Sequence, residues 1–296
     1  MPGFSKVLLI VNRASRRGAR VQHKAVHAFS KAGVAVTVMQ TEAPGHGAQL
    51  AAAHGSDYDA VFTLGGDGTA IEVIGALSHS GPPVGVLPGG TGNIVARTLR
   101  TPATIKRAVP ALLHGDEARI DLGVLQTGQR FAIGMGVGLD ATMIANAPGP
   151  LKRRLGFFAY VVGALKAFAT LEKFTVSLTV DGETKIMRAS AVLVANFGAV
   201  MNDLISFGDG IQRDDGVLNA CVYSPRNMVD ALRILLKMAR KKFTPDPCIY
   251  YAAGSNFFIE TEPPRIGQAD GELIGIGPFR VTVEPLAGRV LVPRRG

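Results

Sequence analysis

The sequence predicts two domains of different class, an α/β domain with a parallel sheet followed by a domain built mainly of antiparallel strands. In the first 122 residues, apolar runs typical of strands alternate with helical patterns. Beyond residue 123 the apolar runs follow one another, and only two helical segments, 151–172 and 227–242, interrupt them. Alternating elements favour a parallel sheet covered on both faces, whereas successive strands joined by turns favour an antiparallel sandwich or barrel.

The first domain can be divided into its elements in chain order. Its predicted strands are 6–11, 34–39, 60–64 and 84–87. A helical pattern through Val21, Ala25 and Phe29 ends at Gly33, and further helices are expected over 47–54 and from Thr69 onward. In such a sheet, ligands bind beyond the carboxyl ends of the strands.

The second domain is expected to begin near residue 122. Its predicted strands are 131–137, 174–180, 185–195, 217–222, 248–252 and 256–259, with a turn at Asp181-Gly182. We therefore assign residues 1–122 to the first domain and 123–284 to the second, and allow a last strand, around 285–296, to return to the first. No linker or internal repeat marks the boundary, so the two domains are expected to meet along a cleft.

Composition restricts the class of protein. Hydrophobic residues make up 47% of the chain and charged residues 19%, as in a soluble globular protein. The net charge of +9 is spread along the chain without interleaved stacking aromatics, which argues against a nucleic-acid partner. Cys221 and Cys248 form no metal or disulfide pattern, and the longest apolar segment, 155–165, is shorter than the roughly 20 residues of a membrane span. These features favour a cytoplasmic protein.

Polar or glycine-rich residues follow each of four predicted strands. The loops are Asn12 to Ser15, Thr41 onward, Gly65 to Thr69, and Pro88 to Asn93. Glycines let backbone N–H groups approach a phosphate, and a helix that begins there adds partial positive charge. Asp67 fits such a site if a divalent cation bridges it to phosphate, or if it takes a proton from an attacking hydroxyl. Alone, GGDG is better explained as a solvated turn, but four loops at one sheet edge predict a nucleotide site.

Together these motifs resemble the diacylglycerol kinase catalytic family, in its bacterial lipid-kinase and sphingosine-kinase-like branch. GGDGTAIEV resembles GGDGTxNEV, and PGGTGNIVARTL resembles PxGTxNDFARxL. NRASR and TEAPGHGAQLA stand where the family has NPxSG and T…GDAxxLA. The later segments IDLG, GLDA (138–141), RLGFFAY, DDGVL and ADGE fall in the family's order. Ile71 and Ile94 replace a usual Asn and Asp, which puts the metal geometry in doubt.

The resemblance implies a Rossmann-like, NAD-kinase-like α/β domain that binds ATP and a C-terminal antiparallel β-sandwich that binds a lipid. The implied nucleotide contacts are Asn12, Arg13, Ala14, Ser15, Arg16, Thr41, Gly65, Gly66, Asp67, Gly68, Thr69, Ala70, Ile71, Glu72, Gly90, Thr91 and Asn93. It also implies that Asp270-Gly271-Glu272 brings a carboxylate to the cleft, so that Asp270 joins Glu272 and Asp67 as a catalytic candidate. Glu272 is then the first choice for the general base, while Asp67 organises Mg²⁺ and phosphates, although in sphingosine-kinase relatives the corresponding Asp is the favoured base.

The segment DDGVL resembles a family site for a structural Mg²⁺. The implied ligands are the Asp215 side chain and backbone carbonyls near Gln212 and Val217, and hard oxygen ligands suit Mg²⁺. From the residues alone, a β-turn at Asp214-Asp215-Gly216 explains the segment at least as well.

The expected activity is transfer of the γ-phosphate of ATP to a hydroxyl of a diacylglycerol-like or sphingoid lipid. Two alternatives stay open: a soluble NAD-kinase-like small-molecule kinase, and a catalytically silent nucleotide- or lipid-binding regulator. A lipid kinase must reach a bilayer, so transient peripheral membrane contact is expected. Its candidates are the basic-then-apolar helix 151–172, for which core packing is the alternative, and Lys237, Arg240, Lys241 and Lys242. The sequence does not decide which lipid is used, nor the oligomeric state, a homodimer included.

Overall fold

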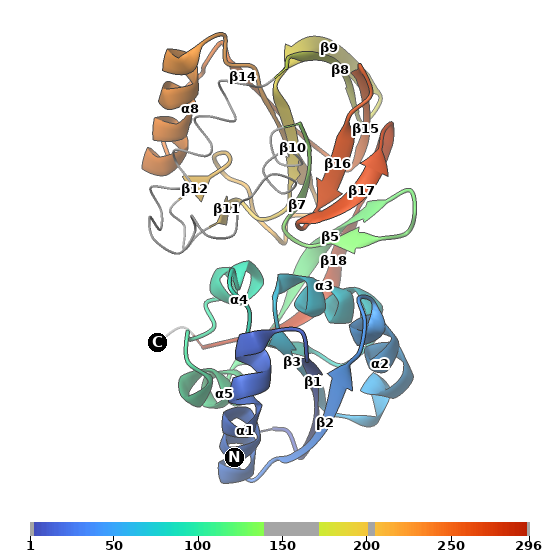
Figure 1. Ribbon diagram of the computed structural model, residues 1–296, viewed down its shortest axis with the longest axis vertical. Helices are drawn as coiled ribbons and strands as arrows, with labels where there is room; N and C mark the ends of the chain where they lie inside the picture. The colour runs from blue at the N-terminus through green and yellow to red at the C-terminus, as the bar shows by residue number, and fades with distance from the viewer. Residues whose placement is uncertain (1–2, 139–171, 201–204, 295–296) are drawn as a thin grey trace. The chain divides into compact units, whose positions relative to one another are not determined.

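The structure, a computed structural model, describes residues 3–138, 172–200 and 205–294 (Figure 1). Its described residues divide into two compact units. The first is formed mainly by residues up to Leu122 and by the chain from Glu284 onward, and the second by the described residues between Gly123 and Val283. Two long strands, β5 (Asp116–Leu125) and β18 (Phe279–Val292), run across these boundaries. Outside the described residues lie the RLGFFAY segment, the GLDA segment after Gly138, and the predicted helix 151–172 except for Glu172.

The first unit contains a parallel sheet with strand order β2-β1-β3-β4-β18. The strands that complete it are β1 (Lys6–Asn12), β2 (Ala35–Thr41), β3 (Ala60–Gly65) and β4 (Val84–Pro88). The helices are α1 (Arg16–Lys31), α2 (His46–His54), α3 (Asp67–Ala76), α4 (Ile94–Thr98) and α5 (Ile105–Leu113). The predicted α/β class and its four strands are confirmed, whereas α4, α5 and β5 were not anticipated.

Alternation along β1 places buried side chains on both faces of this sheet. Val7, Leu9 and Val11 belong to a core that also holds residues of α1 and α5. Leu8 and Ile10, which point the other way, are equally buried. In the first core, Phe29 of α1 packs edge-to-face on Phe62 of β3 with ring centroids 4.8 Å apart. Strands buried on both faces read as continuous apolar runs, which is why they were recognisable in the sequence.

The second unit is an antiparallel β-sandwich, as predicted. One sheet has the order β14-β13-β10-β7-β16-β17, and the other consists of the first part of β18 with β15, β8 and β9. The first sheet comprises β7 (Gly134–Gly138), β10 (Ala191–Ala195), β13 (Leu218–Tyr223), β14 (Ile249–Gly254), β16 (Ile266–Ala269) and β17 (Glu272–Ile276). The second adds β8 (Phe174–Val180), β9 (Glu183–Ala189) and β15 (Asn256–Glu262). Short pairs are β6 (Arg130–Phe131) with β5, and β11 (Ala199–Val200) with β12 (Ile205–Ser206).

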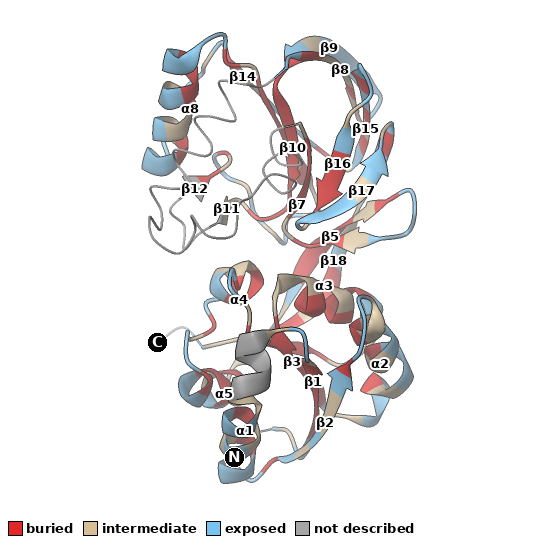
Figure 2. Ribbon diagram, viewed as in Figure 1, coloured by how far each residue is buried: buried red, intermediate tan, exposed pale blue. Residues whose placement is uncertain are grey.

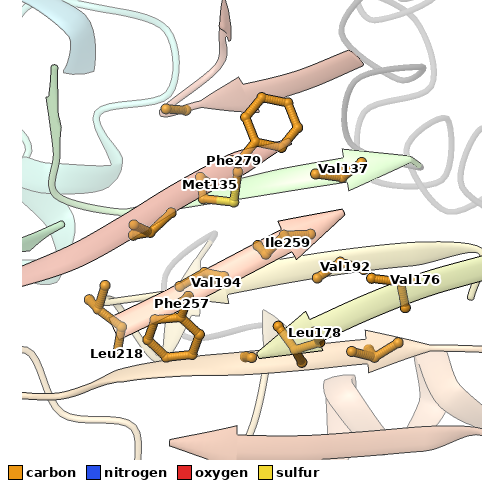
Figure 3. Close-up of a cluster of buried hydrophobic side chains, with 14 of the residues drawn as sticks. Met135, Val137, Val176, Leu178, Val192, Val194, Leu218, Phe257, Ile259 and Phe279 are labelled. Atoms are coloured by element: carbon orange, nitrogen blue, oxygen red, sulfur yellow. The ribbon is translucent and has the colours of Figure 1, made fainter. Parts of the chain in front are cut away.

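The core of the sandwich lies between its two sheets. Figure 3 shows side chains from both, among them Val192 and Val194 of β10 and Phe257 and Ile259 of β15. The alternate residues of β10, such as Leu193, face a second cluster beneath α8 (Met228–Arg240). The helix thus covers the part of the outer face formed by β10 and β13, and both faces of β10 are buried.

Two predicted strands are each divided in the structure. The run 185–195 is not one strand: β9 pairs with β8 in one sheet, and after Ser190 the chain continues as β10 in the other sheet. The run 131–137 breaks between β6 and β7 because the intervening N–H groups bond to a side chain, described below, instead of a strand. In the run 185–195 the corner separates a largely exposed strand, β9, from a fully buried one, β10.

One turn predicted from the sequence is confirmed, and the structure adds a helix cap. Asp181 and Gly182 have φ angles of 48° and 92° and form a tight hairpin turn between β8 and β9, with the positive φ values of a type I′ turn. Asn227 is the N-cap of α8, where its side chain accepts a hydrogen bond from the Asp230 N–H at 3.0 Å. Short polar residues fixed these boundaries locally.

Candidate functional site: joined strand-end loops and a second carboxylate group

The four polar loops of the first unit leave the same edge of its parallel sheet. Asn12 lies opposite Thr41 at the ends of β1 and β2, and Gly65 lies opposite Pro88 at the ends of β3 and β4. Thr41 is buried, whereas Arg13 and Ala14 are exposed in the loop that precedes α1. Arg16 begins α1, and its side chain is outside the described set. The convergence predicted from the sequence is therefore present.

Direct hydrogen bonds join the first loop to its neighbours. Asn12 Nδ2 donates to Thr69 Oγ1 at 2.8 Å, and Ser15 Oγ donates to the Gly89 carbonyl at 2.6 Å. The Gly89 N–H in turn donates to the Gly65 carbonyl at 3.1 Å. Because each bond links residues far apart in sequence, the loops hold one another in place.

The GGDG loop leads directly into α3. Gly66 is the N-cap of this helix, and Asp67, Gly68, Thr69 and Ala70 form its first turn. The free N–H groups and the dipole of a helix N-terminus favour an anion. A Cβ added at Gly66 would meet no atom within 4 Å, so there is open space where the loop meets the helix.

Asp67 ties this loop to the PGGTGN loop. Its Oδ1 atom accepts a hydrogen bond of 2.8 Å from the Val95 N–H in the first turn of α4. Its other oxygen, Oδ2, lies beside Gly92, where a Cβ would be 2.9 Å away. Among the described residues Oδ2 has no hydrogen-bond partner, so this atom is available to a ligand.

Glu72 plays the same part for the second loop. Its Oε1 atom accepts from the Gly45 N–H at 2.9 Å, which draws the loop after β2 against α3. Oε2 approaches Gly47 so closely that a Cβ there would lie 2.8 Å from it. The sequence identified Glu72 as a site residue. Only the structure shows that Gly45 and Gly47 lie against its carboxylate.

Asn93 closes the PGGTGN loop on itself. It adopts a left-handed conformation (φ 50°), accepts from the Gly90 N–H at 2.8 Å and donates to the Gly90 carbonyl at 2.9 Å. A Cβ at Gly90 would lie 2.6 Å from the Gly66 Cα, so only glycine permits this approach of two backbones. Thr91 is exposed at the tip.

The two apolar replacements differ in environment. Ile71 is buried within α3, and Ile94, the first residue of α4, is half-buried. Neither side chain supplies an oxygen, so the polar atoms of the site are the carboxylates of Asp67 and Glu72 with nearby hydroxyl, amide and backbone groups.

These residues suit Mg²⁺ and phosphate chemically. Carboxylate oxygens are hard ligands, and Mg²⁺ commonly uses one or two of them together with substrate phosphates. In the part of the chain that the structure describes, no group of three or more His, Cys, Asp or Glu side chains is arranged to hold a metal by itself.

The predicted structural metal segment is a turn in the second unit. Asp215 is exposed, and its Oδ1 accepts from the Val217 N–H at 3.2 Å, which is a local contact typical of an Asp in a turn. Gly216 has a φ of 78°. Gln212 is also exposed, and the metal roles of Asp215, Gln212 and Val217 stay predictions.

The ADGE segment forms the hairpin between β16 and β17. Asp270 and Gly271 have φ angles of 49° and 91°, and the Asp270 carboxylate accepts from three backbone N–H groups, those of Ala132, Ile133 and Gly134, at 2.7–3.0 Å. Glu272 follows as the first residue of β17. It is exposed and has no hydrogen-bond or ion-pair partner among the described residues.

A carboxylate that accepts three N–H groups holds backbone in place. Asp270 thus fixes the hairpin that carries Glu272 and breaks the strand between β6 and β7. The sequence grouped Asp270 with the catalytic carboxylates because nothing in ADGE reveals a partner more than 130 residues away.

A buried carboxylate absent from the predicted set is Asp121, in the IDLG segment. It is fully buried on β5 and accepts from the Leu286 N–H at 2.7 Å. It stabilises the return of β18 to the first unit.

Among the described residues no helix is long and apolar enough to cross a membrane.

Comparisons with known proteins agree with this architecture. Residues 6–125 match the family model of the diacylglycerol kinase catalytic domain, and residues 133–292 match that of the YegS C-terminal NAD kinase beta sandwich-like domain. A crystal structure from Bacillus anthracis str. Sterne, described as that of a "putative diacylglycerol kinase", is 25% identical, covers 98% of this chain and 97% of that one, and has a TM-score of 0.82.

Two curated relatives extend the comparison. The "Putative lipid kinase SERP0390" of Staphylococcus epidermidis is 30% identical over 80% of this chain and 78% of its own length. An uncharacterized protein of Synechocystis sp. is 28% identical over 79% of this chain, which spans only 54% of that relative. By fold, by domain order and by these matches, the chain belongs to the diacylglycerol kinase catalytic-domain family.

Proposed function

We propose that the protein is an ATP- and Mg²⁺-dependent lipid kinase that transfers the γ-phosphate to a hydroxyl of a diacylglycerol-like or sphingoid lipid. The observation that carries this proposal is the set of four strand-end loops bonded into one glycine-lined site, with a free oxygen on Asp67. Membership of a kinase family supports the reaction class.

In this proposal the first unit binds the nucleotide. The backbone of Gly65 to Thr69 and the start of α3 receive the phosphates, because free N–H groups at a helix N-terminus favour negative charge. The other contacts carried over from the family resemblance are Asn12 to Arg16, Thr41, Ala70, Ile71, Glu72, Gly90, Thr91 and Asn93. Asp67 would hold Mg²⁺ through its Oδ2, and the ion, when bound, neutralises charge on the transferring phosphoryl group.

Glu272 is the proposed general base. An alcohol is a weak nucleophile, and a carboxylate that accepts its proton as the O–P bond forms typically contributes about 10²–10⁴-fold in rate. Its side chain is free of partners among the described residues, whereas Asp270 is held by three N–H groups. We therefore give Asp270 a positioning role and the proton-accepting role to Glu272.

The decisive experiment offers radiolabelled ATP and Mg²⁺ to the full chain with extracted lipids in micelles and, separately, with NAD. We expect label in the lipid phase that is lost in Glu272→Gln and kept in the matched control Glu260→Gln, an exposed carboxylate on β15. Transfer to NAD would instead favour a small-molecule kinase. Binding of ATP without transfer to any acceptor would favour a silent regulator.

A further inference from the structure

The outer face of α8 carries apolar side chains that no described part of the chain covers. The inner face packs on the sheet through Ala231, Ile234 and Met238. On the opposite side Val229 is 72% exposed, Leu232 44% and Leu236 42%. Figure 2 shows the contrast between the exposed outer side of this helix and its buried inner side.

These side chains form one stripe. Residues at positions i, i+3 and i+7 of a helix lie on the same face, so Val229, Leu232 and Leu236 line up along its axis. Isolated exposed apolar residues are common on protein surfaces. An aligned set on a helix whose other face already packs against a sheet indicates a binding partner.

Ion pairs to two largely buried carboxylates fix the position of α8. Asp230 and Asp246 are largely buried and form ion pairs with three cations of the helix and its N-terminal flank: Arg226 and Arg233 with Asp230, and Arg233 and Lys237 with Asp246, at 2.9–3.1 Å. These contacts pair each of the three cations with a largely buried carboxylate. The stripe is therefore held in a fixed orientation, away from the core.

Positive charge that has no ion-pair partner among the described residues adjoins the stripe. Arg240, Lys241 and Lys242 end the helix and its C-terminal turn, and their side chains have no ion-pair partner among the described residues. A groove of about 330 Å³ runs along this face. It is lined by Val229, Leu232, Arg233, Leu236, Lys237, Arg240, Lys242 and Thr244.

We infer that this surface, the α8 face, docks on an anionic membrane. An apolar stripe edged by lysine and arginine is the pattern of a helix that lies in the bilayer interface, where the apolar side chains enter the acyl boundary and the cations meet phosphate headgroups. Charge complementarity selects anionic over neutral lipid. The three flexible basic side chains can also reach headgroups while their methylene stems lie on apolar surface.

The inference deepens the proposed function, because a kinase with a lipid acceptor must meet the bilayer that holds it, but its test does not require catalysis. Full-length protein is sedimented, without ATP, with vesicles of phosphatidylcholine alone or with phosphatidylglycerol added. We expect binding to the anionic vesicles only, weakened by salt since exposed charges are screened.

Two double variants separate the stripe from the cations: Leu232→Ser with Leu236→Ser, and Lys241→Glu with Lys242→Glu. Each should weaken vesicle binding at least about tenfold. The matched control is Ile186→Ser with Arg188→Glu on exposed β9 of the same unit, and it should bind like the natural chain. Circular dichroism and thermal melting verify that each variant folds.

Several results would overturn the inference. They are equal binding to both vesicle types, retained binding in both α8 variants, or self-association in solution that the stripe variant abolishes, which would make the face an interface between copies. Transfer to a soluble short-chain diacylglycerol is measured in parallel. The α8 variants should keep that activity, so a chain that binds vesicles but transfers no phosphate disproves only the kinase proposal.

Discussion

The carboxylate of Asp67 on α3 accepts a hydrogen bond of 2.8 Å from the backbone N–H of Val95 on α4. One oxygen of the acidic residue in the GGDG loop therefore holds the next strand-end loop, and the other is left for a ligand. Asp67 thus has a structural role, the hydrogen bond to Val95, and a proposed chemical role, the binding of Mg²⁺. Two substitutions at this position can separate these roles.

Asp67→Asn should preserve the fold and abolish most of the activity. Asparagine keeps an oxygen that can accept from Val95 but loses the charge that would bind Mg²⁺. We expect stability within about 0.5 kcal/mol of the natural chain and a fall in turnover of about 10²-fold or more. Denaturant unfolding and a phosphoryl-transfer assay measure the two effects.

Asp67→Ala also removes the hydrogen bond to Val95. It should lower the free energy of unfolding by about 1 kcal/mol more than Asp67→Asn does. If the asparagine variant is destabilised as much as the alanine variant, the Val95 contact does not stabilise the loop through the oxygen alone.

Asp270→Ala should mainly destabilise the second unit. The substitution leaves the N–H groups of Ala132, Ile133 and Gly134 without their acceptor, and the expected loss is about 3 kcal/mol because a charged acceptor is removed. Thermal unfolding detects this loss. Glu272→Gln serves as the comparison, since its exposed side chain has no described partner and the melting temperature should not change. A stable Asp270→Ala protein that lacks activity would instead return Asp270 to the catalytic group.

Gly90→Ala should lower stability, whereas Gly66→Ala should weaken ATP binding and leave stability unchanged. At Gly90 the new methyl would lie 2.6 Å from the Gly66 Cα, which is backbone and cannot move aside easily, so the loop must shift and stability should fall by 1–3 kcal/mol, about the cost of overpacking.

At Gly66 the methyl meets no protein atom, and the φ of −90° is allowed for alanine. The Gly66→Ala protein should therefore melt normally, yet bind ATP weakly if phosphate occupies that space. Isothermal calorimetry with ATP tests this, and unchanged affinity would place the phosphates elsewhere.

Asp246 predicts a specific dependence of stability on acid. Burial alone would raise the pKa of this carboxyl, but the Cys248 N–H, Lys237 and Arg233 lower it to about 2. Because the folded pKa lies below the unfolded value of about 3.9, the ionised group stabilises the fold fully above roughly pH 4, and this stabilisation is lost as the pH falls through 2.

The contribution is on the order of 2 kcal/mol. Asp246→Asn should be less stable at pH 7 and should show a flatter loss of stability between pH 4 and 2, measured by urea unfolding at each pH. Asp209→Asn, at an exposed position of the same unit, should follow the natural curve. Parallel curves for the natural chain and Asp246→Asn would contradict the assignment.

The sequence alone was sufficient for the class of each domain and for the edge where the polar loops gather. Strands such as β1 and β3 are buried on both faces and therefore appear as unbroken apolar runs. In a parallel sheet all carboxyl ends lie at one edge, so the convergence of Asn12, Thr41, Gly65 and Pro88 follows from topology. The Asp-Gly turn at 181–182 needed only local chemistry.

Only the tertiary structure decided what each carboxylate does. Asp67, Glu72 and Asp270 look alike in sequence, but their partners lie 28, 27 and up to 138 residues away, and a pattern of neighbours along the chain cannot reveal them. The same limit hid the corner at Ser190, because the strands that pair with β9 and with β10 lie far from the corner in sequence or in another sheet. Burial and pairing are properties of the folded chain. Glu272 is the one proposed catalytic carboxylate that has no partner among the described residues. The sequence could not show this difference, because the partners of Asp67 and Asp270 are known only from the fold.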